Sequence, residues 1–197
     1  MQSVHRLVLG IARLMAMLGG AVLTLLILIT CISILGRASN SVLHAMASAG
    51  ILPGMAQGLI DAGVGAIRGD FEMVEAGMAF CIFAFLPFCT VTGGHASVDV
   101  FTNFLPRGVN RVLEVLIAAL FAAVLVVIAM QLNEGFARKL NSGQTSLLLE
   151  FPIWWSYALS LFGAVMSAAV GVYVALVRLI ELLTGRAIMP NAVGADH

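Results

Sequence analysis

Long stretches without a charged side chain constrain this chain more than any other feature. Each stretch is apolar and at least as long as the run of about 17–25 residues that a helix needs to cross the hydrocarbon core of a membrane. Backbone polar groups in lipid must be bonded within their own segment, so the stretches predict helices and not open strands. They are bounded by Arg13 and Arg37, Glu75 and His95, Glu114 and Glu134, and Glu150 and Arg178.

Composition supports an integral membrane protein. Hydrophobic residues make up 61% of the chain and charged residues 10%, whereas charged residues are roughly a quarter of a soluble domain. We therefore expect an all-α integral membrane protein with four transmembrane helices plus short interfacial helices. Residues 1–185 form a single four-helix membrane domain and 186–197 a C-terminal tail. The expected spans are approximately residues 14–36, 73–93, 112–133 and 151–177.

Charge and cysteine content argue against several other classes. Ten Lys and Arg balance ten Asp and Glu, so no basic field points toward nucleic acid. Cys31, Cys81 and Cys89 all fall in apolar runs without a C-x-x-C spacing, so neither a disulfide framework nor a zinc site is indicated. No cofactor is expected. The first span is longer than the apolar region of a signal peptide, and we expect it to stay in the mature protein.

Four crossings place both termini on one side of the membrane. With the N-terminus inside, the inner segments carry six Lys or Arg residues and the outer loops four, which favours cytoplasmic termini weakly under the positive-inside rule. The inner set is Arg6, Arg13, Arg107, Arg111, Arg178 and Arg186, and the outer set is Arg37, Arg68, Arg138 and Lys139.

The first loop, residues 38–69, is unusually long. Its apolar residues recur near helical spacing on either side of a break at Gly50 and Pro53. We expect two short helices lying at the membrane interface, not a fifth span. A flexible Ala/Gly loop is the alternative.

The stretch "GGHASVDVF" follows the second span. Gly93 and Gly94 can adopt left-handed angles and so close that helix. His95 would then lie just past the negative end of the helix dipole, and Ser97 or Asp99 could cap a short following helix. A turn with polar residues in the headgroup zone explains the stretch equally well.

Two sets of motifs resemble the small (Q-type) membrane subunit of tripartite ATP-independent periplasmic (TRAP) transporters. The first set is Glu72 and Glu75 at the head of span two, then "GGHASVD" and "LPRGVNR". The second is "GQTSLLLEFPIWWSYALSLFG", which leads into the last span. The ordered match covers roughly residues 70–165. The family's usual proline before Gly163 is replaced here by Leu161 and Phe162, and the first loop is longer than in the family.

The resemblance implies a three-part assembly in the bacterial inner membrane. A periplasmic solute-binding receptor captures an organic acid anion, a large membrane subunit holds the substrate and sodium sites, and the small subunit supports the large one. This chain would be that non-enzymatic support, with membrane lipid as its surroundings. Residues carried over by the resemblance have expected roles in assembly and interface anchoring: Glu72, Glu75, Gly94, His95, Asp99, Pro152 and Trp154.

The residues themselves suggest similar roles. Glu72 and Glu75 suit the positive end of a helix dipole, and nothing nearby completes a catalytic or metal site around them. Trp154 lies where an aromatic belt is expected. Small residues also recur every four positions on span four and near the middle of span three, so we expect these spans to contact each other or a partner there. They are Gly163, Ser167 and Gly171 on span four and Ala118 and Ala122 on span three.

Two other function classes deserve comparison. A haem- or quinone-associated anchor of a redox complex also uses four helices, but haem ligation needs histidines that face each other within the bundle. The four histidines, His5, His44, His95 and His197, all lie outside the expected spans. A self-sufficient exporter would need an acidic residue inside the membrane, and the spans contain none.

Overall fold

The computed structural model describes residues 2–50, 53–94 and 107–184. Over these residues the chain forms five helices, of which the four longest are long and apolar enough to cross a membrane. This confirms the expected all-α membrane fold with four transmembrane helices. The helices are α1 (Gln2–Ser48), α2 (Pro53–Asp61), α3 (Asp70–Thr92), α4 (Arg107–Ser142) and α5 (Trp154–Thr184).

The first helix differs from the expectation. Instead of ending near residue 36 and being followed by two short helices, α1 continues unbroken to Ser48. Residues 38–48 contain only residues that a helix tolerates, and the first breakers are Gly50, which has a φ of 71°, and Pro53. The second short helix is present as α2, which packs back on the end of α1.

The fourth span begins later than expected, at Trp154 instead of residue 151. Residues before it pair with the preceding segment of the loop. Thr145 and Pro152 form an antiparallel bridge, and the Ile153 N–H donates a 3.0 Å hydrogen bond to the Gln144 carbonyl. The third helix ends as predicted. Gly93 caps α3 in a left-handed conformation, with φ 64°, and the Gly94 N–H donates to the Cys89 carbonyl at 2.9 Å.

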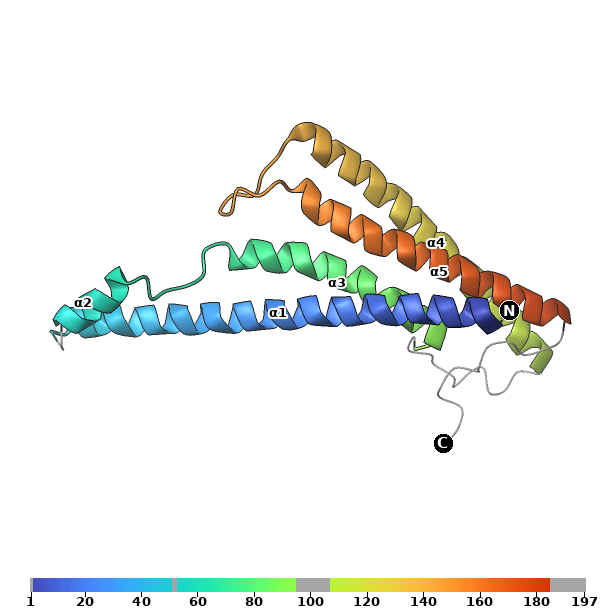
Figure 1. Ribbon diagram of the computed structural model, residues 1–197, viewed down its shortest axis with the longest axis horizontal. Helices are drawn as coiled ribbons and strands as arrows, with labels where there is room; N and C mark the ends of the chain where they lie inside the picture. Colours follow the sequence, from blue (N-terminus) through green and yellow to red (C-terminus); the bar gives the residue numbers. More distant parts are fainter. Residues whose placement is uncertain (1, 51–52, 95–106, 185–197) are drawn as a thin grey trace.

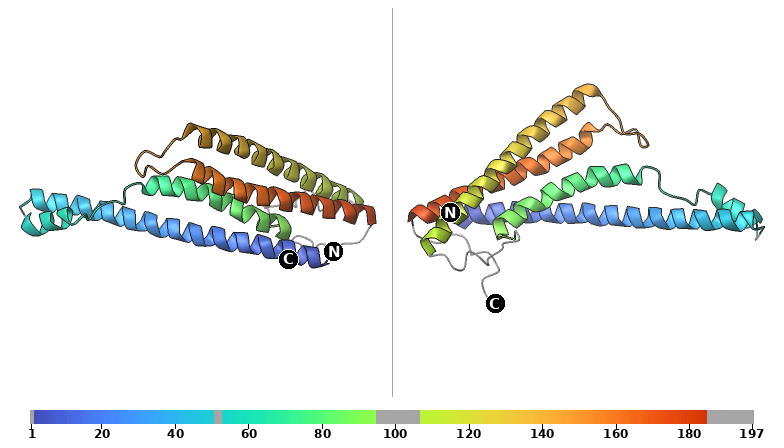
Figure 2. Two further views of the ribbon diagram at one scale, coloured as in Figure 1. Left: turned by 45° about the horizontal axis from the view of Figure 1, so that its top comes forward. Right: turned by 180° about the vertical axis from the view of Figure 1, so that it is seen from behind.

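The long helices form an open row in the order α1, α3, α5, α4 (Figure 1). Among the described residues α3 packs on α1 and α5, whereas α4 packs mainly on α5. The view from behind shows the α1/α3 pair and the α4/α5 pair diverging toward one end (Figure 2, right). We call this end, which carries α2 and the loop between α4 and α5, the loop end. The other, where α1 begins and α5 ends, is the terminal end.

The contact between α1 and α3 depends on glycines at which the helices approach closely. A Cβ on Gly19 would lie 2.9 Å from the Ala84 Cβ, and one on Gly77 would lie 2.7 Å from the Leu26 side chain. The buried Cys81 thiol donates to the Gly19 carbonyl at 3.4 Å. Cys81 therefore acts as a small packing residue with a weak hydrogen bond.

The predicted small-residue surface of the last span lies in the interior of the molecule. Gly171 faces α4, where its Cβ would lie 3.5 Å from the Ala122 Cα. Gly163 and Ser167 face α3 instead, and the Ser167 hydroxyl is 2.9 Å from the Phe83 carbonyl oxygen. The expected contact between the last two spans is thus confirmed at Gly171, whereas the other two positions join α5 to α3.

Charged residues indicate how far each helix reaches beyond the hydrocarbon. At a rise of about 1.5 Å per residue, the stretch from Arg13 to Arg37 covers about 36 Å, close to the thickness of the hydrocarbon core. The whole of α1 has 47 residues and would be about 70 Å long. The last eleven residues of α1, together with α2, therefore extend beyond the apolar layer at the loop end.

We predict that Gly36→Ala loosens this extension. A Cβ on Gly36 would overlap the Gly65 carbonyl group, so the segment that leads from α2 to α3 would have to move. Limited proteolysis of residues 50–69 should become several times faster, because the clash outweighs the helix-propensity gain of about 1 kcal/mol for Gly to Ala. Gly10→Ala is the control, since nothing lies within 4 Å of Gly10. Equal cleavage of both variants would contradict the prediction.

Candidate interface at the loop end

An ion pair joins α1 to the start of α3 at the loop end. The Arg37 guanidinium lies 2.8 Å from the Asp70 carboxylate, which also accepts a 2.5 Å hydrogen bond from the Ser33 hydroxyl. Ser33 is fully buried and also accepts the Ile67 N–H at 3.2 Å. The three side chains therefore fix the place where the chain re-enters the membrane as α3.

The loop between α4 and α5 folds as a short hairpin over residues 144–153. Besides the bridge between Thr145 and Pro152, the Ser146 N–H donates to the Phe151 carbonyl at 2.9 Å. Glu150 has a φ of 53°, which is uncommon for a residue other than glycine and marks the turn. The hairpin presents Leu147 at its tip, with 93% of its surface exposed.

Glu72 holds this hairpin against α3. Its carboxylate accepts hydrogen bonds from three successive backbone N–H groups, those of Leu147 and Leu148 at 2.9 Å and that of Leu149 at 3.0 Å. A carboxylate is a strong acceptor for such a group of amides, because charge-assisted hydrogen bonds exceed neutral ones in strength. We call this set of three hydrogen bonds the Glu72 clasp.

The Leu149 side chain completes the contact by packing over Gly69. This glycine precedes α3 in a left-handed conformation, with φ 76°, and any side chain at this position would overlap Leu149. Leu149 takes part in both contacts, because its backbone N–H belongs to the Glu72 clasp. Together they tie the α4/α5 pair to the start of α3 at the end where the two helix pairs diverge.

A cleft between α3, α4 and α5 lies next to the Glu72 clasp, and Glu72 is part of its lining. The cleft has a volume of about 470 Å³. Glu72 and Glu75 line one side of it, and the Ser156 and Tyr157 side chains line another. The rest of the lining is mostly apolar and comes from α3, α4, α5 and the hairpin: Ala76, Ala79, Phe83, Leu132, Thr145, Ser146, Leu147, Phe151, Ile153 and Ser160.

Aromatic side chains order the junction of α4 and α5 beside the cleft. Trp154 makes an edge-to-face contact with Phe136 of α4, with ring centroids 6.3 Å apart, and a second one with Trp155 at 5.9 Å. Tyr157 packs on Gly135, where a Cβ would lie 2.9 Å from the ring. Trp155 is exposed, so these aromatics combine helix packing with a surface suited to the membrane interface.

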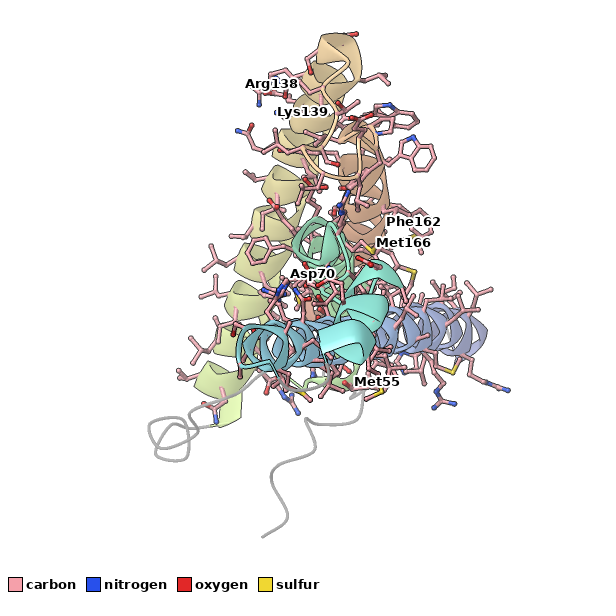
Figure 3. All side chains as sticks on the ribbon, turned by 90° about the vertical axis from the view of Figure 1, so that its left-hand side faces the viewer. Met55, Asp70, Arg138, Lys139, Phe162 and Met166 are labelled. Carbon is pink, nitrogen blue, oxygen red and sulfur yellow. The ribbon has the colours of Figure 1, made fainter. Side chains whose placement is uncertain are left out.

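The loop end presents two separate projections. Viewed along the molecule from this end (Figure 3), Arg138 and Lys139 near the end of α4 lie far from Met55 of α2, with Asp70 between them. The projection formed by the end of α1 and by α2 is almost free of charged residues, whereas the projection formed by the end of α4 carries the two cations. A partner that covers this end would therefore meet two chemically different surfaces.

The structure separates the predicted site residues into three groups. Glu72, Glu75, Pro152 and Trp154 come together at the loop end. Gly163, Ser167 and Gly171 lie in the helix contacts of the interior, and Gly94 lies at the terminal end. His95 and Asp99, with the short helix expected after them, lie outside the described residues.

Sequence reasoning missed two sets of contacts at the loop end. Ser33, Arg37 and Asp70 form a junction that no local sequence motif predicts. Asp70 lies more than 30 positions after its two partners on α1. The groups that bind Glu72 are backbone N–H groups, which every residue type except proline carries, so no sequence motif marks them. The one available signal was Asp70 at the start of an apolar helix, where a carboxylate often has a structural partner.

The described residues do not offer a constellation for metal or haem chemistry. No group of three or more His, Cys, Asp or Glu side chains among them could hold a metal ion. Of the histidines in the described part, His5 stacks on Tyr173 near the start of α1, with ring centroids 6.5 Å apart, and His44 lies near the other end of the same helix. They do not face each other across the bundle, so the geometry does not favour a haem-bearing anchor.

Comparison with known proteins gives a family match. The family model described as "Tripartite ATP-independent periplasmic transporters, DctQ component" matches residues 62–184. The matched region contains α3, α4, α5 and the hairpin with the Glu72 clasp, and it begins just after α2. No curated protein and no solved structure matches the chain.

Proposed function

The chain belongs to the DctQ family, the small membrane components of TRAP transporters, and from this we propose that it supports the large membrane subunit of such a transporter. The complete system would take up an organic acid anion, coupled to sodium and dependent on a periplasmic solute-binding receptor. Membership makes the chain a transporter component and a multi-pass membrane protein. The substrate class, the coupling ion and the need for a receptor are parts of the proposal.

The observation that carries this proposal is the open row of helices. In a closed four-helix bundle each helix buries one face against a shared core. Here α1 and α4 lie at the outer edges of the row and bury little of their surface within the chain. Such a row offers broad apolar faces to a larger membrane protein, and small-residue and van der Waals packing would hold them together.

The features that a transport site requires are not found in the described spans. Secondary transporters build their midplane sites from discontinuous helices, whose exposed ends bind substrate and ions. Although α3 contains Pro87, it runs as one helix from Asp70 to Thr92, and α1, α4 and α5 are also continuous. Glu72 and Glu75 lie near the start of α3, at the border of the apolar layer and not at its middle. This supports a role outside the transport step.

The proposed placement is the bacterial inner membrane with cytoplasmic termini. The loop end, with α2 and the hairpin, would then face the periplasm and the receptor. In this arrangement Glu72, Glu75, Pro152 and Trp154 shape the periplasmic end of the contact with the large subunit. Gly94, His95 and Asp99 would belong to an assembly contact on the cytoplasmic side.

Reconstitution tests the proposal directly. Liposomes that contain this chain, the large subunit and an inward sodium gradient, with the receptor outside, should accumulate the solute. Liposomes that contain the chain alone, under the same gradient and receptor, should stay at the background of empty liposomes. Sodium-dependent uptake by the chain alone would overturn the supporting role, and full uptake by the large subunit and receptor without this chain would do so as well.

A further inference from the structure

The cleft behind the Glu72 clasp combines an acidic mouth with apolar walls. Glu75 lies at the mouth, one turn of α3 after Glu72, and Ala79 and Phe83 follow at intervals of one turn. The walls therefore continue from the border of the apolar layer toward its interior. This change of polarity with depth matches an amphiphile whose head stays at the membrane surface and whose chain lies in the hydrocarbon.

The two glutamates differ in how their charge is satisfied. Glu72 accepts three backbone N–H groups, whereas Glu75 is exposed and has no hydrogen bond or ion pair with any described residue. Because side chains three positions apart share one face of a helix, both carboxylates raise the negative potential at the mouth. The mouth therefore carries an uncompensated charge that attracts a cationic group.

The size of the cleft restricts what can fill it. A helix with its side chains is about 10–12 Å wide, so a cavity of about 470 Å³ would hold only about one turn of a partner helix. An acyl chain is much narrower and can lie along the wall formed by α3. A metal ion is a poorer fit, because one of the two carboxylates is already used by the hairpin.

We propose that this cleft binds a phospholipid whose headgroup carries a primary ammonium group, as phosphatidylethanolamine does. The ammonium donates charge-assisted hydrogen bonds to the Glu75 carboxylate, and one acyl chain lies against Ala76, Ala79 and Phe83. A trimethylated ammonium, as in phosphatidylcholine, has no N–H to donate and binds more weakly. The bound lipid fills the space between the diverging helix pairs without a partner protein.

Native mass spectrometry of the full-length chain tests this proposal. In detergent with equal amounts of phosphatidylethanolamine and phosphatidylcholine of matched chains, the wild-type protein should retain the first in about fivefold excess. Glu75→Gln should abolish this preference. Ala79→Leu, which fills the wall and keeps Glu75, should lower the retention of both lipids. Glu134→Gln is the matched control, because Glu134 is exposed near the same border on α4 but does not line the cleft.

Equal retention of the two lipids by the wild type, or an unchanged preference in Glu75→Gln, would overturn the proposal. The measurement is then repeated on the complex with the large subunit. Retained phosphatidylethanolamine supports a lipid as the occupant, and its loss on assembly would show that the partner fills the cleft. Because the first measurement needs only this chain, it stands or fails independently of the proposed transport function.

Discussion

Replacing Gly163 by leucine is expected to destabilise the chain by about 2–3 kcal/mol, the cost of overpacking a tightly packed interior. A Cβ at this position would lie 2.8 Å from the Phe83 Cβ and 3.4 Å from the Phe83 carbonyl carbon. Since the nearest atoms include backbone, α3 and α5 would have to separate. The separation would also break the hydrogen bond from the Ser167 hydroxyl to the Phe83 carbonyl.

Thermal unfolding of the purified protein measures this effect, and recovery of the large subunit in a pull-down reports its consequence for assembly. Gly163→Ala should lie between the wild type and Gly163→Leu, because even one Cβ is too close. Gly20→Leu makes the same exchange on α1 at a position with nothing within 4 Å. A Gly163→Leu protein as stable as the Gly20→Leu protein would show that α3 and α5 tolerate separation at this point.

The four spans could be predicted because the bilayer enforces a simple rule. A helix must place an uncharged, apolar stretch in the hydrocarbon, so charged residues such as Arg37 and Glu114 mark its limits in the sequence. Helix ends outside the membrane follow no such rule. The continuation of α1 to Ser48 depended on the lack of a helix breaker before Gly50, whereas we expected the span to end near residue 36 and a separate short helix to follow.

Local signals also predicted the residues that determine close approach. Gly93 was expected to adopt a left-handed conformation, and it does. Small residues on the last span were expected at a helix contact, but their spacing could not say which helix they face. Gly163 lies against α3 and Gly171 against α4, because α5 occupies an inner position of the row. The place of α5 in the row depends on how the helices pack together, and the sequence of one span does not determine this.

Of the contact between Glu72 and the hairpin, only the glutamate side could be predicted from the sequence. Glu72 and Glu75 were singled out as a pair, yet the structure gives them different surroundings. What separates them is the hairpin, whose backbone amides lie more than 70 positions away from Glu72 in the chain. Periodicity can place two carboxylates on one face of a helix. It cannot show which of them meets a distant loop.

Replacing Glu72 by alanine is expected to release the hairpin. The three amides of the Glu72 clasp, at Leu147, Leu148 and Leu149, would lose their common acceptor. Hydrogen exchange over residues 144–153 should then be at least about tenfold faster, because exchange reports the local opening of such bonds. Glu72→Gln should give an intermediate rate, since its amide oxygen can accept some of these hydrogen bonds without the contribution of charge.

Glu75→Gln is the matched control for this experiment, because Glu75 lies one turn further along α3 and has no described partner to lose. Its hairpin should exchange at the wild-type rate, although the same substitution is expected to remove the lipid preference. Exchange in Glu72→Ala equal to that in Glu75→Gln would mean that Leu149 over Gly69 is enough to hold the hairpin. A faster rate confined to Glu72→Ala would assign the hairpin's position to a single carboxylate. The Glu72 clasp would then determine the shape that the loop end offers to its partner.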